Sequence, residues 1–161
     1  MPRYMTRFGA NRIEAEVHHL WRQERPEIVE QVRAAAEQGD RSENAAYIYG
    51  KKRLREIDSR LRYLRNKLKD VTILDVEEQI QFDDVRFGAI VSVVDDDDKK
   101  STWRLVDKEE SDPKAMRISI QSPIGKALLG KKEGDYVEIA LPKGRVGLEI
   151  TALRYGVGKP D

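Results

Sequence analysis

The chain has 161 residues, of which 37% are charged and 39% apolar, and its formal net charge at pH 7 is +1. This near-neutral total argues against a protein that binds nucleic acid through a uniformly basic surface. The absence of cysteine excludes disulfides, thiolate metal sites and cysteine nucleophiles. No apolar run approaches the ~20 residues of a membrane-spanning helix, and the N-terminus lacks the apolar core of a secretory signal. The composition predicts a soluble cytoplasmic protein without a membrane partner.

The N-terminal part of the chain is more basic than the rest. Residues 1–76 carry 16 basic and 12 acidic residues, whereas residues 77–161 carry 14 and 17. The spacing of apolar residues changes near the same point, from a helical period to a strand-like alternation. We therefore expect two domains, one over residues 1–75 and one over residues 76–161.

The first domain is predicted to consist of two long helices, at about 11–38 and 42–70. Pro26 interrupts the first helix and predicts a kink, Gly39 is its expected end, and Ser42 is the expected N-cap of the second helix. A short connection makes the two helices an antiparallel coiled-coil hairpin. The second helix has a heptad seam formed by Leu54, Ile57, Leu61, Leu64, Leu68 and Val71. The first helix has a less regular set of core candidates, namely Ile13, Val17, Leu20, Trp21, Ile28, Val32 and Ala35.

The second domain begins after an expected linker at residues 72–82. Apolar residues alternate from Val85 to Val93, which predicts a strand. A short helix is expected from Pro123 to Leu129, with Ser122 as its N-cap. Further strands are expected at residues 101–107, 116–121, 135–141 and 145–154. The predicted fold class is α+β: a helical hairpin followed by a compact, mostly antiparallel β domain with one short helix.

Two carboxylates, Asp40 and Glu43, lie at the tip of the predicted hairpin. One interpretation is local, because acidic side chains near a helix N-terminus interact favourably with free amides and the helix dipole. The other is functional, because two carboxylates can complete a metal site on a partner molecule. Mg²⁺ commonly takes one or two carboxylates and keeps several waters, so this pair alone would hold the ion poorly.

Residues 51–69 carry nine basic residues and only two acidic ones, Glu56 and Asp58. On a helical wheel the basic residues flank the leucine seam in two stripes. The first stripe is Lys51, Arg55, Arg62 and Lys69, with Arg65 closer to the seam; the second stripe is Arg53, Arg60 and Lys67. Flanking charges of a coiled coil commonly pair with the partner helix, and we expect this for much of the second stripe. The first stripe leads toward the tip and suits a chain of phosphates.

Familiar catalytic motifs are absent from the sequence: it has no phosphate-binding glycine loop, no G-x-S-x-G and no H-E-x-x-H. A run of four aspartates, 95–98, lies between two expected strands. We interpret it as a solvated hairpin loop. The sequence thus offers no enzyme site of its own in these classes.

Several segments resemble the Gre family of bacterial transcript-cleavage factors. They are Gly39-Asp40-Arg41-Ser42-Glu43-Asn44-Ala45 and the basic run from Lys51 to Asp58. The run Leu20-Trp21-Arg22-Gln23-Glu24-Arg25-Pro26-Glu27 is similar to the GreB branch. The stretch Ile118 to Ile124 and the later Ala127-Leu128-Leu129 and Gly134-Asp135 resemble the family's second domain. The resemblance covers about residues 5–155.

The resemblance implies a coiled coil that enters the secondary channel of RNA polymerase and an FKBP-like C-terminal domain that docks on the channel rim. When polymerase has backtracked, the RNA 3′ end is extruded and elongation stops. The factor then stimulates the polymerase's intrinsic endonucleolytic cleavage of that RNA, and elongation resumes. The resemblance also implies an accessory factor without independent activity, which acts as a monomer.

Site residues follow from the same resemblance. Asp40 and Glu43 match the acidic tip pair, which is expected to stabilise a weakly held Mg²⁺ supplied by the polymerase active site and to orient the attacking water. The expected tip support consists of Arg41, Ser42 and Asn44. The expected RNA-binding basic patch consists of Lys51, Lys52 and Arg55. The expected polymerase contacts are Ser122 and Pro123.

Two other functions stay open from the sequence. A channel-binding regulator could block nucleotide entry without stimulating cleavage. A prolyl isomerase or chaperone would need an aromatic-lined pocket in the C-terminal domain. The candidates for that pocket are Phe82, Phe87, Trp103, Tyr136 and Tyr155, of which one or two are expected in the core.

Overall fold

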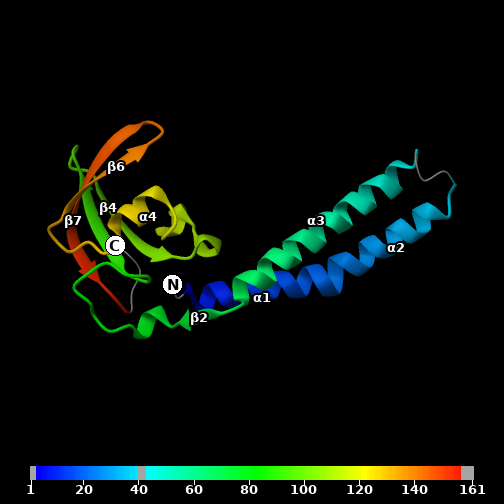
Figure 1. The fold of residues 1–161 in the computed structure, drawn as a ribbon, viewed down its shortest axis with the longest axis horizontal. Coiled ribbons are helices and arrows are strands. Elements are labelled where there is room, and N and C mark those ends of the chain that lie inside the picture. Colours follow the sequence, from blue (N-terminus) through cyan, green and yellow to red (C-terminus); the bar gives the residue numbers. More distant parts are fainter. Residues whose placement is uncertain (1–2, 40–42, 157–161) are drawn as a thin grey trace. The chain divides into compact units, whose positions relative to one another are not determined.

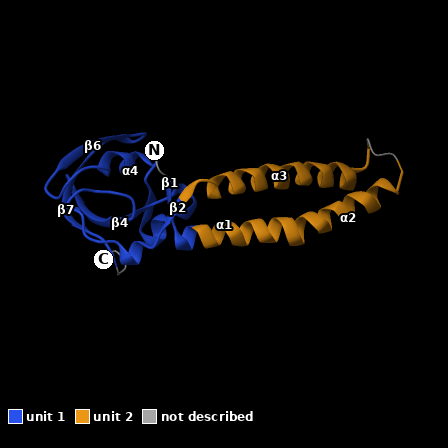
Figure 2. Ribbon diagram, turned by 60° about the horizontal axis from the view of Figure 1, so that its bottom comes forward, with its two compact units in different colours: residues 1–9, 72–161 blue, residues 10–71 orange. Residues whose placement is uncertain are grey.

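The computed structural model describes residues 3–39 and 43–156, which fall into two compact units (Figure 2). The arm is Ala10–Val71, and the sheet unit combines Met1–Gly9 with Thr72–Asp161. The first nine residues thus belong to the sheet unit, although the sequence placed them with the arm. The reason is a non-local pairing, because strands β1 (Arg3–Thr6) and β2 (Val71–Leu74) form a two-stranded sheet.

The arm is an antiparallel pair of helical rods (Figure 1). The first rod consists of α1 (Arg7–His19), a π-helical segment (Leu20–Glu24) and α2 (Arg25–Ala36), and the second rod is α3 (Ala45–Leu68). Pro26 lies in the first turn of α2, directly after the π-helical segment. The irregularity that the sequence predicts at Pro26 takes the form of a π-helical turn just before it. Such turns occur mostly as single-turn bulges inside α-helices.

The seam of the arm is largely the one that the heptad pattern predicts. Trp21 is an exception, because the sequence placed it in the core and 48% of its surface is exposed. Gly50 is buried, and a Cβ at this position would lie 2.5 Å from Val32 Cγ2. The helices thus approach closely where glycine lacks a side chain. The buried seam residues are Ile13, Leu20, Ile28, Ala35, Ile57, Leu61 and Leu64.

The sheet unit contains a five-stranded sheet with the order β5-β4-β3-β7-β6. The β4–β5 pair is parallel and the other neighbours are antiparallel. Helix α4 (Pro123–Leu128) packs on the sheet through Leu128, which is fully buried. The described architecture is α+β, as expected. The strands are β3 (Ile90–Asp95), β4 (Lys100–Val106), β5 (Arg117–Ser119), β6 (Tyr136–Leu141) and β7 (Gly144–Arg154).

The alternation before β3 predicts burial correctly but not the strand itself. Val85, Phe87 and Ala89 are all buried, yet the strand begins only at Ile90. Gly88 adopts a φ of 86°, a conformation that favours glycine and breaks the extended backbone. Its N–H donates to the carbonyl of Leu105.

The expected linker at residues 72–82 is ordered by side-chain hydrogen bonds as well as by β2. Gln79 Nε2 donates to the carbonyl of Phe87, and Gln81 exchanges two hydrogen bonds with the backbone of Tyr155. A 3₁₀ turn (Val76–Glu78) lies between them and β2. Over residues 3–39 and 43–156, none of the helices combines the length and apolar character that crossing a membrane requires.

Candidate functional site

Asn44 closes the described end of the hairpin. Its Oδ1 accepts a hydrogen bond from the backbone N–H of Tyr47 at 3.1 Å, and its Nδ2 donates to the carbonyl of Ala35 at 2.7 Å. One side chain therefore caps the N-terminus of α3 and satisfies a carbonyl in the last turn of α2. The structure corrects the expected cap, because α3 begins at Ala45 and its N-cap is Asn44 rather than Ser42. Asn is among the preferred N-cap residues.

Glu43 directly precedes this cap and is exposed. Glu43 lies one residue before the N-cap, and the first turn of α3 itself holds no acidic residue. Among the described residues it has no hydrogen-bond or ion-pair partner. The exposed carboxylate of Glu43 is compatible with both the local and the functional interpretation of the tip carboxylates. The other tip residues named by the sequence, Asp40, Arg41 and Ser42, lie outside the described residues.

The structure describes only part of the tip's donor set, because Asp40 lies outside the described residues. Within residues 3–39 and 43–156, no group of three or more His, Asp or Glu side chains could hold an ion. Glu43 offers one carboxylate whose oxygens are unshared. Such a ligand fits a hard cation that other groups already coordinate.

The second stripe of α3 is neutralised by the opposite helical rod. Arg53 Nε donates to Glu24 Oε1 at 2.6 Å, and Arg60 forms a two-pronged pair with Glu16 at 2.8 and 3.1 Å. The hydrogen bond from Arg60 holds the pKa of Glu16 below its usual range. These two arginines are half-buried. The structure confirms for both of them the predicted pairing across the hairpin.

The first stripe differs in every one of these respects. Lys51, Arg55 and Arg62 are exposed, and none forms an ion pair with a residue that the structure describes. Lys52, which the sequence placed in the basic patch, is also exposed and forms no ion pair with a residue that the structure describes. Their positive charge is therefore available to a polyanion.

Trp21 lies along the edge of the arm that the first stripe occupies. On that edge Arg25 of the first rod pairs with Asp58 of α3, since its Nε donates to Asp58 Oδ1 at 2.9 Å. This hydrogen bond lowers the pKa of Asp58. The guanidinium carbons of Arg65 and Arg25 lie 5.2 and 5.5 Å from the Trp21 ring centroid. The sequence missed this exposed cluster. The proline that follows the tryptophan, together with the irregular core spacing of this helix, is the only signal that could have indicated it.

Helix α4 carries the two residues expected to contact polymerase. Ser122 Oγ donates to the carbonyl of Ser119 at 2.6 Å and accepts from the N–H of Gly125 at 3.0 Å, which makes it the N-cap that the sequence predicts. Its hydroxyl is thus engaged within the chain. Pro123 follows at the first helical position and is exposed.

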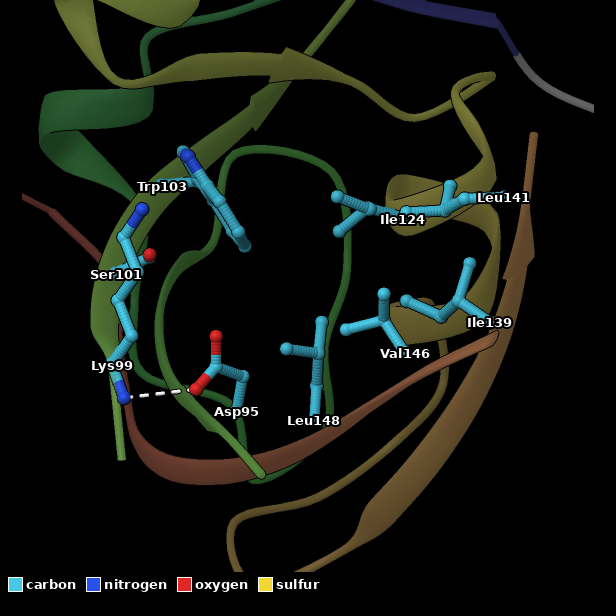
Figure 3. Close-up of a pocket in the computed structure, with 9 residues that line it drawn as sticks. All are labelled: Asp95, Lys99, Ser101, Trp103, Ile124, Ile139, Leu141, Val146 and Leu148. Carbon is cyan, nitrogen blue, oxygen red and sulfur yellow. Dashed lines mark hydrogen bonds between the residues drawn. The ribbon is translucent and has the colours of Figure 1, made fainter. Parts of the chain in front are cut away.

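Beside α4, the sheet unit has an apolar pocket of about 200 Å³ (Figure 3). Trp103 is the one aromatic residue that lines it. Tyr155 is buried against Phe82 with its hydroxyl bonded to the backbone of Asp84 and Arg86. A multi-aromatic pocket of the kind required for prolyl isomerisation is therefore not formed around this cavity. The lining residues are Asp95, Lys99, Ser101, Trp103, Ile124, Ile139, Leu141, Val146 and Leu148.

The aspartate run forms the solvated loop that the sequence predicts, between β3 and β4. Asp95 Oδ1 accepts from the backbone N–H groups of Asp97 and Lys99, both at 2.9 Å (Figure 3 shows the second bond). The Tyr136 hydroxyl donates to Asp96 at 3.1 Å, which raises the pKa of Tyr136. Two of the four carboxylates thus fix the loop rather than a ligand.

Comparisons with known proteins agree with this arrangement. The family model described as transcription elongation factor, N-terminal, matches residues 3–73, and the model for the GreA/GreB C-terminal domain matches residues 79–155. The chain is 45% identical over 152 residues to transcription elongation factor GreB of Yersinia pestis, covering 94% of this chain and 88% of that protein. It is 44% identical over 154 residues to GreB of Pseudomonas putida, covering 96% and 94%.

A GreA relative is similar over the same length. Transcription elongation factor GreA of Rhodospirillum rubrum is 40% identical over 153 residues, covering 94% of this chain and 97% of that protein. Among solved structures, that of GreA factor homolog 1 (Gfh1) of Thermus thermophilus aligns at a TM-score of 0.44 and 24% identity, covering 95% of this chain and 99% of that one. The family models and the sequence relatives agree: this chain belongs to the GreA/GreB family of transcription elongation factors.

Proposed function

We propose that this chain stimulates the intrinsic endonucleolytic cleavage of RNA by RNA polymerase in backtracked, arrested complexes. The arm enters the secondary channel of the polymerase, and the sheet unit docks on the channel rim. Cleavage of the extruded RNA leaves a new 3′ end from which elongation resumes. The chain acts as an accessory factor and a monomer, and the reaction takes place in the polymerase active site.

The exposed carboxylate of Glu43 is the observation that carries this proposal. It stands at the end of a hairpin whose two helices are joined by Asn44, and the helices make no use of it. The first turn of α3 itself holds no acidic residue. Glu43 and Asp40, three residues earlier in the chain, together supply the one or two carboxylates that an incompletely coordinated Mg²⁺ accepts.

Each tip residue then has a chemical role in phosphodiester hydrolysis. Mg²⁺ shared with the polymerase supplies Lewis acidity when it is bound. Asp40 and Glu43 contribute negative charge beside that ion and accept a hydrogen bond from the attacking water, which orients its oxygen. Asn44 holds the chain at the start of α3 so that Glu43 is presented in one position. The carboxylates coordinate no ion without the polymerase.

The basic patch and α4 serve binding rather than chemistry. Lys51, Lys52 and Arg55 are exposed cations on α3, a few residues after the tip in the chain. Their charge suits them to bind the phosphates of extruded RNA. On the sheet unit, Pro123 offers an exposed apolar contact to the polymerase rim. Ser122 supports that contact by capping α4, since its hydroxyl is bonded within the chain.

The test is transcript release from a stalled elongation complex. Asp40→Ala and Glu43→Ala are expected to reduce stimulated cleavage by about 10²-fold or more, the scale of losing a catalytic charge, while binding to polymerase stays within about twofold. Glu37→Ala is the matched control, because Glu37 is an exposed carboxylate near the tip that pairs with Arg33. It should cleave at the parental rate. Parental cleavage by both tip variants would refute the proposal.

The same assay separates cleavage from channel blocking. A regulator that only blocks nucleotide entry would slow elongation without shortening the RNA. If the parental chain slows elongation and releases no fragment, the tip mechanism is wrong. If it releases a fragment and restores elongation, blocking is excluded.

A further inference from the structure

Trp21 is the exposed residue that the arm itself explains least. A tryptophan is large and apolar, and burial would gain more here than at most positions. Yet nearly half of its surface is exposed, on the π-helical segment that sequence spacing placed in the core. π-helical turns occur frequently at functional sites. The exposure of Trp21 is therefore explained either by a ligand that the ring binds or by a purely structural role.

The charges around Trp21 do not cancel. Arg25 and Arg65 both lie over its ring, and Arg62, three residues before Arg65 on α3, is exposed and contributes to the lowered pKa of Asp58. Asp58 is the carboxylate on this edge, and it is engaged by Arg25. Arg62 and Arg65 form no ion pair with any residue in the described ranges. Arg65 lies against the ring without an ion pair, so its N–H groups are not engaged by a carboxylate of the described residues.

The Trp21 cluster continues the first stripe away from the tip. Lys51, Arg55, Arg62 and Arg65 follow one edge of α3, and 14 residues of helix correspond to about 21 Å. An exposed aromatic ring at one end of a line of unpaired cations is the combination found in proteins that bind single-stranded nucleic acid. Unstacked bases stack on aromatic rings and on arginine planes, while phosphates contact the cations.

We infer that Trp21 and Arg65 form a stacking subsite for an unpaired base of single-stranded RNA, with Arg62 as its phosphate contact. The subsite lies about 33 Å along α3 from Glu43. It extends the proposed RNA contact beyond Lys51, Lys52 and Arg55, and to that extent it rests on the proposed function. The partner is RNA rather than an acidic protein surface, because the ring would otherwise add little to a contact between charges.

The arm offers a matched control on its other edge. Tyr63 is 38% exposed, and the Arg60 guanidinium lies 5.3 Å from its ring centroid. That arginine is paired with Glu16, so this aromatic stands beside a neutralised cation. Loss of Tyr63 reports the general effect of removing an exposed aromatic from the arm.

The experiment measures affinity for stalled elongation complexes in a full-length background with Asp40→Ala and Glu43→Ala, where stimulated cleavage is expected to be lost. One set of complexes extrudes about two nucleotides. The other extrudes well over ten, which is enough, since about ten span 33 Å even at the ~3.4 Å rise of a duplex strand and a single strand extends further. Trp21→Ala should lower affinity for the long-RNA complexes about 5- to 100-fold, the range for one lost base stack, and leave the short-RNA complexes unchanged. Trp21→Phe should restore most of the loss, and Tyr63→Ala should change neither set.

Three results would overturn the inference. One is an unchanged affinity of Trp21→Ala for long-RNA complexes. Another is an equal loss for short and long RNA, which would indicate a contact with the polymerase protein. A third is an equal loss for Tyr63→Ala, which would indicate weakening of the whole arm; thermal unfolding of each variant checks this. If the intact tip stimulates no cleavage but the length-dependent loss is seen, the proposed function fails and the stacking subsite stands.

Discussion

The two basic stripes of α3 carry the same residue types but differ in burial and in ion pairing. Arg53 and Arg60 are half-buried and paired with carboxylates of the other rod, whereas Arg55 and Arg62 are exposed and form no ion pair with the described residues. The second stripe therefore contributes to holding the hairpin together. In the first stripe, Lys51, Arg55 and Arg62 carry charge that forms no ion pair with the described residues. The net charge of a helix therefore indicates a binding surface only after the charges that are paired within the hairpin have been subtracted.

The largest effect is expected at the seam that separates the stripes. Leu64 is fully buried between the rods, so Leu64→Ala should lower the free energy of unfolding of the arm by about 2–5 kcal/mol. Amide hydrogen exchange of α3 in the full-length protein measures this locally. Both stripes should lose their functions together. Retention of normal exchange rates would show that the seam is not the main source of arm stability.

Gly50 tests how closely the rods must approach for the pairs to form. Alanine is a better helix former than glycine by up to ~1 kcal/mol, but its Cβ would collide with Val32. Overpacking of this kind typically costs about 1–3 kcal/mol, so Gly50→Ala should destabilise the arm on balance. Val32→Ala in the same chain should relieve the collision, and the double variant should be more stable than the sum of the single effects predicts. A stabilising Gly50→Ala would mean that the helices separate without cost.

Arg60→Ala and Arg55→Ala test most directly whether the two stripes have different roles. Loss of Arg60 removes a partly exposed pair and should cost about 0.2–1 kcal/mol of arm stability. Loss of Arg55 removes no pair and should leave stability within about 0.5 kcal/mol. Affinity for RNA-extruding complexes should show the reverse order, with Arg55→Ala weakened and Arg60→Ala close to parental. The distinction between the stripes fails if both variants lose stability and affinity to the same extent.

The smallest expected effect is a dependence on pH. Hydrogen bonds from Arg60 and Arg25 hold the pKa values of Glu16 and Asp58 below their usual range. A carboxyl group with a lowered folded-state pKa stabilises the fold above its unfolded value, about 4 for these residues, and this stabilisation is lost as pH falls through the folded value. Both side chains are about two-fifths exposed, so solvent screening limits the effect to a few tenths of a kcal/mol.

Arm stability should accordingly be flat from pH 7 to about 5 and decline below about 4.5. Thermal unfolding followed by circular dichroism at a series of pH values measures the decline. In the Arg60→Ala variant the share that Glu16 contributes should be absent, which makes the decline shallower. An unchanged slope would show that the pair with Arg60 contributes nothing to the acid sensitivity of the arm.

Local patterns predicted much of the fold and part of the site. The seam at Ile57, Leu61 and Leu64 and the cap at Ser122 depend on neighbours within one turn, and both were found as expected. The N-cap of α3 is Asn44 rather than the predicted Ser42; both residue types are good caps, and Asn44 also donates to the carbonyl of Ala35. That bond joins two helices and leaves no trace in the local pattern.

The misplacement of Trp21 has a similar origin. A heptad or helical period assigns faces on the assumption of a regular helix, and a π-helical turn adds one residue to the count. The turn buries Leu20 and exposes its neighbour Trp21, since adjacent helical residues point about 100° apart, whereas Ile28 and Ala35 further along stay in the core as predicted. Similarly, the assignment of residues 1–9 to the sheet unit depends on the pairing of β1 with β2, which lie more than sixty residues apart in the chain.

Spacing and residue type were enough to predict the two-rod arm, the α+β class, Glu43 at the end of the hairpin and the two basic stripes. These features follow from spacing and residue type, which act over a few residues. Which arginines are neutralised, and the exposure of Trp21 beside Arg25 and Arg65, follow from the tertiary structure alone. Those outcomes depend on the register of one helical rod against the other, and register is set by packing along the whole interface rather than by any single segment.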